Sequence, residues 1–302
     1  MEDKKVIILM STYNGEKYIK EQMESIFNQT YKNIKIFVRD DGSKDNTLNI
    51  LKEYENQGKI KLSYGENLGF AKSFYWLLEN TEQSDYYSFA DQDDIWLENK
   101  IENAVNILNN MDNLKPALYF CDFDFYDKDM NFISHKNRIK AKITLQSALV
   151  NNINCGFTTV INYELLKYYL LMPAEKNIPH DYLALIIAVT LGNVYYDFNV
   201  LAKYRRHDRN VSSEIYSNNF FKIQLNRINN FLINDKFNYK KRWIEINNIY
   251  NNYFDCTIKN IFRIYTNYKL INNLKKLFCI NRYRDTILDE LAVRFIFLIG
   301  KL

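Results

Sequence analysis

The stretch YYSFADQDD, residues 86–94, joins a short run of aromatic and small residues to three carboxylates within four positions. Residues 86–90 are predicted to form a buried strand. Asp91, Asp93 and Asp94 repel one another at neutral pH unless a cation lies among them. Because Mg²⁺ and Mn²⁺ bind one or two carboxylates and complete their shell with substrate phosphates, this strand end predicts a metal–diphosphate site. The alternative is a solvated acidic loop.

Strands and helices alternate on both sides of this stretch. The regular alternation predicts an α/β fold, with a mostly parallel sheet covered by helices on both faces. In such sheets, ligands bind at the carboxyl ends of the strands. The other strands predicted in this half cover residues 6–10, 34–38, 60–64 and 117–121, and helices are predicted over 17–28, 45–54, 69–79 and 98–109.

The alternation loosens after about residue 144. The pattern predicts a strand over 157–161 and a strand pair over 195–204 that turns near 197–199. Helices are predicted first over 145–150, 163–171 and 182–189, and then over 217–234, 239–255, 257–278 and 283–300. We therefore expect a boundary near residue 213, followed by an all-helical region.

Composition limits the class of protein. The chain has 302 residues and four cysteines without a C-x-x-C pair, which argues against a zinc ribbon or a dense disulfide framework and favours a reducing compartment. The apolar run Val6–Met10 is too short for a signal peptide. Residues 291–302 contain Arg294 and Lys301 and are too short to span a bilayer. We expect a soluble or peripheral intracellular protein.

Charge is unevenly distributed along the chain. Residues 215–302 contain 15 Lys+Arg and 6 Asp+Glu, a net charge of about +9, and the remaining 25 and 30 leave about −5 for residues 1–214. A basic helical tail is compatible with a solvated face, with an anionic membrane surface and, least of all, with nucleic acid.

Two further polar clusters follow predicted strands. Residues 11–15 (STYNG) follow the first strand and residues 40–43 (DDGS) follow the second, so three polar clusters meet at one edge of the sheet. Asn-Gly and Asp-Gly are also ordinary turn signals, which is the simpler interpretation of each cluster alone.

Together these motifs resemble the family 2 glycosyltransferases of the GT-A fold, especially bacterial rhamnosyltransferase-like members that build surface polysaccharides. The resemblance covers about residues 4–213. It implies a GT-A catalytic domain over 1–213, with a nucleotide-sugar half over about 1–115 and an acceptor half over about 116–213, followed by a basic helical region over 214–302. The matching motifs are residues 11–15, 40–43 with Asp45 and Thr47, 67–69 (NLG), 91–96 (DQDDIW), 180–181 (HD) and 204–207 (YRRH) with Asn210.

The resemblance implies roles for single residues in binding the nucleotide sugar. Tyr13 offers a stacking face for the base, and either Asp41 or its neighbour Asp40 accepts a hydrogen bond from it. Lys72 lies beneath the diphosphate or is an ordinary surface lysine. The residues implied for donor binding are Thr12, Tyr13, Asn14, Glu16, Asp40, Asp41, Asn67, Gly69, Lys72, Asp91 and Arg206.

For the metal, the resemblance implies Asp91 and Asp93 as the D-x-D element, with Asp93 the direct ligand of Mn²⁺ or Mg²⁺. His207 would close over the diphosphate or supply a further ligand, and an ordinary basic loop is the alternative. Asp181 would be the general base, although an Asp at a helix start is also a common N-cap. The alternating Asp122, Asp124, Asp127 and Asp129 are interpreted as a solvated face.

The implied reaction is metal-dependent, inverting sugar transfer from a nucleoside-diphosphate sugar to a saccharide hydroxyl on a lipid-linked oligosaccharide. The motif over residues 91–96 leans weakly toward a dTDP-rhamnose donor. A sugar-1-phosphate nucleotidyltransferase is the enzymatic alternative, but residues 12–16 are not a Gly- and Lys-rich phosphate loop. A protein that binds nucleic acid through the tail is the other alternative, and it leaves the acidic loop without a purpose.

The tail also suggests a location. Basic and aromatic residues on helices suit the inner face of an anionic plasma membrane, which would place the protein in the cytoplasm beside a lipid-linked acceptor. The alternative is a helical subdomain whose aromatic residues pack on the catalytic domain or form a homodimer. The aromatic residues that prompt both interpretations are Phe220, Phe221, Phe231, Trp243, Tyr250, Phe254, Phe262, Phe278, Phe295 and Phe297.

Overall fold

The structure is a computed structural model that describes residues 4–208, 210, 239–267 and 269–300. It divides into two compact units, Met1–Arg138 with Asn154–His207, and Ile139–Ile153 with Asp208–Leu302. Residues 139–153 therefore pack with the C-terminal helices, although the sequence analysis assigned them to the catalytic domain. The expected boundary near residue 213 lies outside the described residues and stays a prediction.

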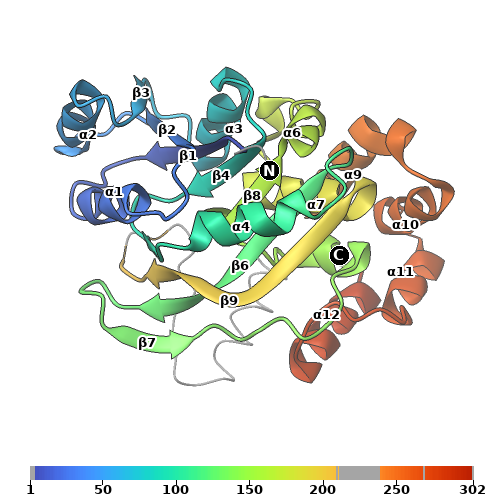
Figure 1. Cartoon of the computed structure of the whole chain (residues 1–302). Coiled ribbons are helices and arrows are strands. Elements are labelled where there is room, and N and C mark those ends of the chain that lie inside the picture. The colour runs from blue at the N-terminus through green and yellow to red at the C-terminus, as the bar shows by residue number, and fades with distance from the viewer. Residues whose placement is uncertain (1–3, 209, 211–238, 268, 301–302) are drawn as a thin grey trace. The chain divides into compact units, whose positions relative to one another are not determined.

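A nine-stranded sheet forms the centre of the first unit (Figure 1). Its order is β3-β2-β1-β4-β8-β6-β9-β5, and β7 pairs with β6. Because β1 is parallel to both β2 and β4, the carboxyl ends of these three strands lie at the same edge. The strands are β1 (Val6–Thr12), β2 (Ile34–Asp40), β3 (Lys61–Tyr64), β4 (Tyr86–Ala90), β5 (Ile95–Trp96), β6 (Ala117–Tyr126), β7 (Phe132–His135), β8 (Thr159–Asn162) and β9 (Asn193–Arg205).

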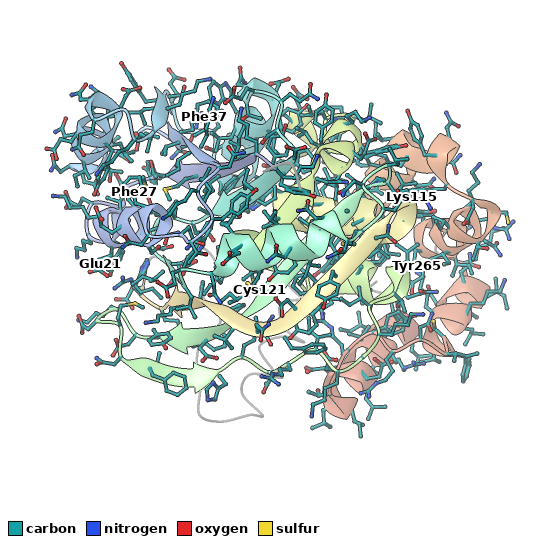
Figure 2. All side chains as sticks on the ribbon, viewed as in Figure 1. Glu21, Phe27, Phe37, Lys115, Cys121 and Tyr265 are labelled. Carbon is teal, nitrogen blue, oxygen red and sulfur yellow. The ribbon has the colours of Figure 1, made fainter. Side chains whose placement is uncertain are left out.

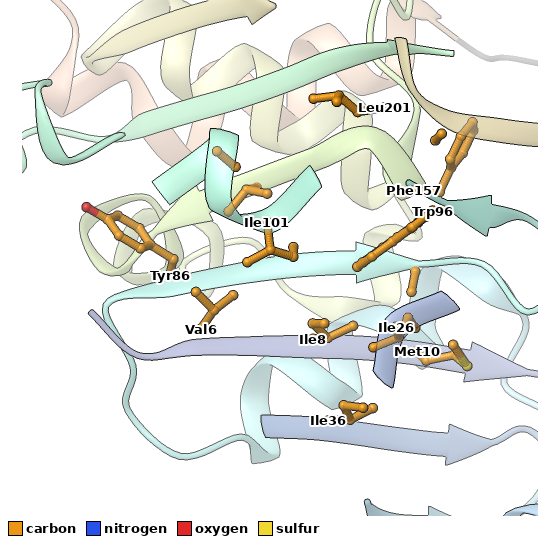
Figure 3. Close-up of a cluster of buried hydrophobic side chains, with 14 of the residues drawn as sticks. Val6, Ile8, Met10, Ile26, Ile36, Tyr86, Trp96, Ile101, Phe157 and Leu201 are labelled. Carbon is orange, nitrogen blue, oxygen red and sulfur yellow. The ribbon is translucent and has the colours of Figure 1, made fainter. Parts of the chain in front are cut away.

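Side chains of alternate residues in the strands build a core on one face of the sheet. Val6, Ile8 and Met10 of β1 pack there with Ile26 and Ile101 (Figure 3). These last two come from α1 (Ile19–Phe27) and α4 (Lys100–Asn109), and α2 (Thr47–Asn56) adds buried residues to the same cluster. Three amphipathic helices therefore cover this face.

The opposite face carries α3 (Phe70–Asn80), α6 (Tyr163–Tyr169) and α7 (His180–Leu191). Phe89 of β4 meets Phe74 of α3 edge to face, with ring centroids 5.7 Å apart. Tyr75 of α3 meets Tyr169 of α6 at 6.0 Å. The predicted α/β fold with a mostly parallel, doubly covered sheet is confirmed.

The structure differs from the prediction in the second half of the sheet. The expected strand pair over 195–204 is one long strand, β9, parallel to β6, with its register shifted opposite Asp122. The turn signal near Asp197 therefore marks an irregularity within a strand and not a hairpin. In addition, β8 lies antiparallel between β4 and β6, which breaks the parallel run.

The second unit is helical. Its described helices are α5 (Leu145–Val150), α9 (Tyr239–Tyr250), α10 (Cys256–Thr266), α11 (Leu270–Leu277) and α12 (Ile287–Leu298). The single helix expected over 257–278 is thus two helices, α10 and α11. The helix expected over 217–234 lies outside the described residues.

Trp243 of α9 is the centre of this unit. Its side chain is fully buried and its Nε1 donates to the carbonyl of Leu149 at 3.0 Å. Its ring meets Tyr265 of α10, which is labelled in Figure 2, edge to face at 5.3 Å. Most of the described tail aromatics are buried in the same way. They are Trp243, Tyr250, Phe254, Phe262 and Phe297. Within the described residues, no helix is long and apolar enough to cross a membrane.

Candidate active site

Asp94 is the buried end of the acidic loop that follows β4. Its Oδ1 accepts a hydrogen bond from the backbone N–H of Arg205 at 3.1 Å. Its Oδ2 is buried without a hydrogen-bond partner among the described residues. Burial raises the pKa of Asp94 well above its usual range, and the charges of Asp93 and Asp91 add to the rise. The alternative from the sequence, a solvated acidic loop, therefore does not describe Asp94, because its carboxyl group is buried.

Asp91 connects this loop with α7. Burial raises the pKa of Asp91 to about 7, and the neighbouring charges of Asp93 and Asp181 contribute to the rise. The geometry agrees, because the ring of His180, beside Asp181, packs on Phe89 of β4 with centroids 4.7 Å apart, so the start of α7 lies beside the strand that the acidic loop follows. Three of the predicted site carboxylates are thus brought together.

His207 contacts the predicted metal ligand Asp93. The imidazole Nε2 lies 2.8 Å from Oδ2 of Asp93, and the ring stacks on Tyr18 with centroids 4.7 Å apart. Arg205 contacts the same tyrosine, since its guanidinium carbon lies 4.7 Å from the Tyr18 ring centroid. Arg205 also pairs with Glu21 of α1, labelled in Figure 2, and donates from Nε to the carbonyl of Asp93 at 2.9 Å. The end of β9 is therefore fastened to the acidic loop.

These residues fit a divalent cation that is bound together with a diphosphate. Within the described ranges, no group of three or more His, Cys, Asp or Glu side chains is arranged to hold a metal ion by itself. Two protein ligands suffice where substrate phosphates and water complete the shell of Mg²⁺ or Mn²⁺. The crowding of Asp91 with Asp93 and the unpartnered oxygen of Asp94 are the conditions that a cation relieves.

Asp181 lies in the first turn of α7. Its Oδ1 accepts a hydrogen bond from the N–H of Tyr182 at 2.8 Å. The N-cap position belongs to Pro179, so the interpretation of Asp181 as an N-cap is wrong, although the carboxylate still binds a first-turn N–H. A negative charge at this end of a helix interacts favourably with the helix dipole.

His180 is buried directly beside Asp181. Neither ring nitrogen has a hydrogen-bond partner among the described residues, and the ring packs on Phe74 and Phe89 at centroid distances of 4.0 and 4.7 Å. Burial lowers the pKa of His180 to about 4. A Cβ at Gly156 would lie 2.3 Å from Nε2, so a glycine there makes room for the imidazole. His180 therefore links β4, α3 and α7 as a neutral ring.

The loop after β1 holds four of the predicted donor-binding residues. Thr12 is buried and its hydroxyl donates to Asp40 at 2.9 Å, whereas Tyr13 is 43% exposed. Asn14 has φ of 50° and its Oδ1 accepts from the N–H of Lys44 at 2.8 Å. Glu16 accepts from the N–H of Asn46 at 2.9 Å. Asn14 and Glu16 thus bind the neighbouring loop.

Gln92 is a residue that the sequence analysis did not single out. Its Oε1 accepts from the N–H of Tyr13 at 2.9 Å, and its Nε2 donates to the carbonyl of Tyr13 at 3.0 Å. A Cβ at Gly15 would lie 2.2 Å from Oε1 of Gln92, which explains the glycine. The acidic loop is therefore tied to the loop after β1 through the middle residue of its D-x-D element.

Asp40 and Asp41 are both buried and both hydrogen-bonded. Asp40 accepts from the Ser43 N–H at 2.9 Å and from its hydroxyl at 2.6 Å. Asp41 pairs with Arg39 and accepts from the N–H groups of Leu68 and Gly69, each at 2.9 Å. Asp40 shapes its own turn, and Asp41 fixes the loop before α3. Which of them accepts a bond from a base stays a prediction.

Arg39 is a second residue that sequence reasoning missed. Its guanidinium is buried, donates to Ser73 Oγ at 3.1 Å and to the Glu66 carbonyl at 2.9 Å, and lies 5.5 Å from the Trp76 ring centroid. An arginine that immediately precedes two aspartates in a strand could have signalled this ion pair.

Asn67, Gly69 and Lys72 lie where the resemblance implies, on the loop and first turn of α3. Asn67 Oδ1 accepts from the Gly69 N–H at 3.0 Å, and Gly69 precedes α3 with φ of 80°. A positive φ there favours glycine. Lys72 is half-buried in the first turn of α3. Their contact with a diphosphate stays a prediction.

Arg206 and the aspartates of β6 complete the predicted residues. The Arg206 guanidinium lies 4.0 Å from the ring centroid of Phe125. The interpretation of Asp122 and Asp124 as a solvated face is wrong, because both are buried in β6. Asp122 accepts from the Tyr196 hydroxyl at 2.7 Å and pairs with Lys136 at 3.2 Å. The prediction failed because β6 is longer than the predicted strand and runs on to Tyr126, so these aspartates lie within the sheet.

A groove of about 490 Å³ lies elsewhere on the first unit. It contains none of the predicted site residues. Its lining is Lys20, Glu21, Glu24, Ser25, Asn28, Ile95, Trp96 and Glu98.

Residues 7–170 match the family described as Glycosyl transferase family 2. An uncharacterised glycosyltransferase of Rickettsia typhi is 34% identical over 208 residues, which are 67% of this chain and 64% of that protein. The dTDP-rhamnosyl transferase RfbG of Shigella flexneri is 46% identical over 105 residues, 33% of this chain and 36% of that protein. The chain thus spans less than two thirds of these relatives.

Solved structures share the fold at low sequence identity. The S. aureus TarS 1–349 in complex with UDP-GlcNAc has a TM-score of 0.60 and 17% identity, covering 99% of this chain and 79% of that one. The mannosyltransferase PcManGT of Pyrobaculum calidifontis, in complex with GDP-Man and Mn²⁺, has a TM-score of 0.52 and 14% identity, covering 99% and 86%. The fold is therefore that of the GT-A glycosyltransferases.

Proposed function

Because the chain belongs to glycosyl transferase family 2, we propose that it transfers a sugar from a nucleoside-diphosphate sugar to a saccharide hydroxyl, with inversion at the anomeric carbon. The observation that carries this proposal is the packing of His180, the neighbour of Asp181, on Phe89 at the end of β4, with ring centroids 4.7 Å apart, because it brings the start of α7 beside the strand that the acidic loop follows. In this proposal, a base for the attacking hydroxyl and a site for the leaving diphosphate would lie on opposite sides of the reacting anomeric carbon.

Asp181 is the general base of this proposal. The acceptor hydroxyl attacks the anomeric carbon from the face opposite the diphosphate, and Asp181 takes the hydroxyl proton as the bond to phosphate breaks. The transition state resembles an oxocarbenium ion, as in glycoside hydrolysis. The hydrogen bond from the Tyr182 N–H supports this role because it fixes the orientation of the carboxylate.

Asp93 and Asp91, with His207, are the residues proposed to hold a divalent cation. When bound, such a cation would offset the negative charge that develops on the departing diphosphate. The contact of His207 with Asp93 supports this set, and the stacking of His207 on Tyr18 limits how the imidazole can turn. Arg205 supports it indirectly, since it binds the backbone carbonyl of Asp93.

The donor is proposed to bind at the carboxyl ends of β1 and β2. Thr12, Tyr13 and Asn14 would line the base and ribose, and Asp41 or Asp40 would accept from the base. The partial exposure of Tyr13 supports stacking on a base. Similarity to a protein named dTDP-rhamnosyl transferase favours dTDP-rhamnose as the first donor to test.

The acceptor is proposed to be a lipid-linked oligosaccharide at the cytoplasmic face of the plasma membrane. A relative in Escherichia coli, 28% identical over 214 residues, is named for an α-D-GlcNAc-diphosphoundecaprenol acceptor. That relative covers 70% of this chain, and the match spans 81% of the relative. A lipid acceptor would make peripheral attachment to the membrane useful, and a homodimer through the C-terminal helices is the alternative use of that region.

A donor-hydrolysis panel with the purified chain tests the proposed function. The panel contains dTDP-rhamnose, UDP-glucose, UDP-GlcNAc and GDP-mannose, each with Mn²⁺, with Mg²⁺ and with EDTA. One donor should be hydrolysed slowly in the presence of a metal, and EDTA should abolish that hydrolysis. Equal hydrolysis in EDTA would contradict the proposed metal dependence. Failure to bind any nucleoside diphosphate would contradict the proposed glycosyltransferase activity.

A further inference from the structure

Helix α11 has three polar residues buried and two large apolar residues exposed. Asn272, Asn273 and Lys276 face inward, whereas Leu270 and Ile271 are 69% and 56% exposed. A surface helix of a globular protein normally shows the opposite arrangement. The α11 sequence is amphipathic, yet its apolar stripe is turned away from the unit to which it belongs.

The buried side of α11 explains this orientation. Nζ of Lys276 lies among the rings of Trp243, Tyr265 and Phe297, at 5.4 to 5.8 Å from their centroids. Burial lowers the pKa of Lys276 to about 8. The interior aromatic cluster therefore surrounds the lysine. Leu270 and Ile271 are left exposed, and the other two leucines of α11 are half-buried.

Helix α12, which packs against α11 (Figure 1), adds a second exposed apolar stripe. Ile287, Leu291, Phe295 and Leu298 follow one another at helical spacing, and each is about half exposed or more. Its inward residues, such as Ile296, already fill the interior. Both helices thus expose apolar side chains beyond what their own unit can cover.

The turn between the two helices is the most exposed part of this region. Phe278 is 75% exposed and Ile280 is 98% exposed. Exposure of such large apolar side chains to water is unfavourable, and their transfer to an apolar boundary lowers the free energy.

Exposed basic residues lie on α11, on the segments before and after it, and on α10, which packs against α11. The acidic residues of the same helices are engaged, since Glu290 binds Arg294 and the Tyr283 N–H, and Asp289 binds Thr286. A second copy of the chain on this surface would bring like charges together, whereas an anionic lipid surface would complement them. The exposed basic residues are Lys259, Arg263, Lys269, Lys275 and Arg282.

We propose that the exposed apolar residues of α11, α12 and the turn between them dock on an anionic lipid bilayer. The apolar side chains would enter the boundary between headgroups and acyl chains, and the basic residues would contact the headgroups. The inference deepens the proposed function, because it names the part of the chain that would bring the enzyme to a lipid-linked acceptor.

The test measures binding of the full chain to sedimented vesicles. We compare phosphatidylcholine vesicles with vesicles that contain about one third phosphatidylglycerol, at about 0.05 M and about 0.5 M salt. The wild-type chain should bind the anionic vesicles at low salt and lose most binding at high salt. The double variant Phe278→Ser/Ile280→Ser should bind at least about tenfold more weakly, and Lys275→Gln/Arg282→Gln should lose about tenfold at low salt.

Leu114→Ser is the matched control, since Leu114 is an exposed leucine of the first unit. It should bind vesicles as the wild type does. Donor hydrolysis without vesicles should be the same for all these variants, which separates this inference from the proposed function. A chain that hydrolyses donor but ignores anionic vesicles overturns the docking surface. So does a chain that forms dimers lost in Phe278→Ser/Ile280→Ser, because a second copy is then the occupant.

Discussion

The two sides of the candidate site differ in how their polar groups are satisfied. At the ends of β1 and β2, Asp40 and Asp41 each accept three hydrogen bonds or ion-pair contacts from neighbouring groups. At the end of β4 and the start of α7, an oxygen of Asp94 and both nitrogens of His180 have no hydrogen-bond partner among the described residues. The first side is built for stability, and the second keeps polar groups at a cost in stability, as functional sites do.

Asp181→Asn is the strongest test of this difference. Loss of a general base should lower the rate of transfer by about 10²–10⁴-fold. Donor binding should stay nearly unchanged, and the thermal midpoint should stay the same or rise, because one of three neighbouring carboxylates is neutralised. Kinetics with saturating donor and calorimetry measure the two effects.

Asp289→Asn is the control for Asp181→Asn, because Asp289 also lies in the first turn of a helix, α12. It should leave transfer unchanged. Wild-type kinetics for Asp181→Asn would show that Asp181 has only a structural role and would remove the base from the mechanism.

Arg39→Met tests the other side of the comparison. It leaves the buried carboxylate of Asp41 without its cation, and breaking a buried ion pair in this way costs about 3–5 kcal/mol. The free energy of unfolding, measured with urea, should fall by that amount. The control Lys35→Met, on the same strand, removes an exposed pair with Glu82 and should leave the free energy of unfolding nearly unchanged. Equal costs would show that burial does not distinguish the two pairs.

Asp93→Asn should slow transfer by about two orders of magnitude, because it weakens the cation that offsets the charge on the leaving diphosphate. Mn²⁺ affinity in the presence of a nucleoside diphosphate, measured by titration calorimetry, should fall with it. Asp129→Asn, at an exposed position of the turn after β6, should change neither. Full activity of Asp93→Asn would contradict the metal assignment.

The fold followed from the sequence where hydrophobic period and turn signals agree. The strand ending at Ala90 is an example, because it is a short run that is buried at every position. The helix ending at Asn109 is another, because it buries apolar residues at helical spacing. Sequence reasoning failed at β9, where the polar residues near Asp197 signal a turn, although that carboxylate is buried and accepts from the Tyr119 hydroxyl at 2.7 Å. A long-range hydrogen bond of this kind has no local signature.

The candidate site was predictable to the extent that it consists of carboxylates at strand ends. Asp91 and Asp93 could be found in this way, and Asp181 only through the family resemblance. Gln92 and Tyr18 were missed because their partners come from distant parts of the sequence. Arg39 pairs with Asp41 only two residues away, and it was missed because arginine has many ordinary uses at a surface. Membrane contact of the tail was predicted from its charge and aromatic content. Trp243 is buried, however, so the exposed aliphatic residues of α11 and α12 are the ones available for such contact.

The smallest expected effect concerns His180 and the pH dependence of stability. The folded chain holds this imidazole neutral, with its pKa lowered to about 4 from the usual 6.5. As pH falls below about 6.5, the unfolded chain takes up a proton that the folded chain does not, so the free energy of unfolding decreases until pH reaches about 4. Between pH 7 and pH 5 this single group should lower the free energy of unfolding by about 2 kcal/mol.

His180→Leu removes that pH-dependent loss. The stability of the variant relative to the wild type should therefore rise by about 2 kcal/mol over the same interval, whatever the difference at pH 7. Urea unfolding of both proteins at several pH values measures this relative change without requiring that leucine pack as well as the imidazole. If the free energies of unfolding of the two proteins change in parallel with pH, His180 has a proton-accepting partner in solution. It would then no longer be an example of an unsatisfied polar group on the second side of the site.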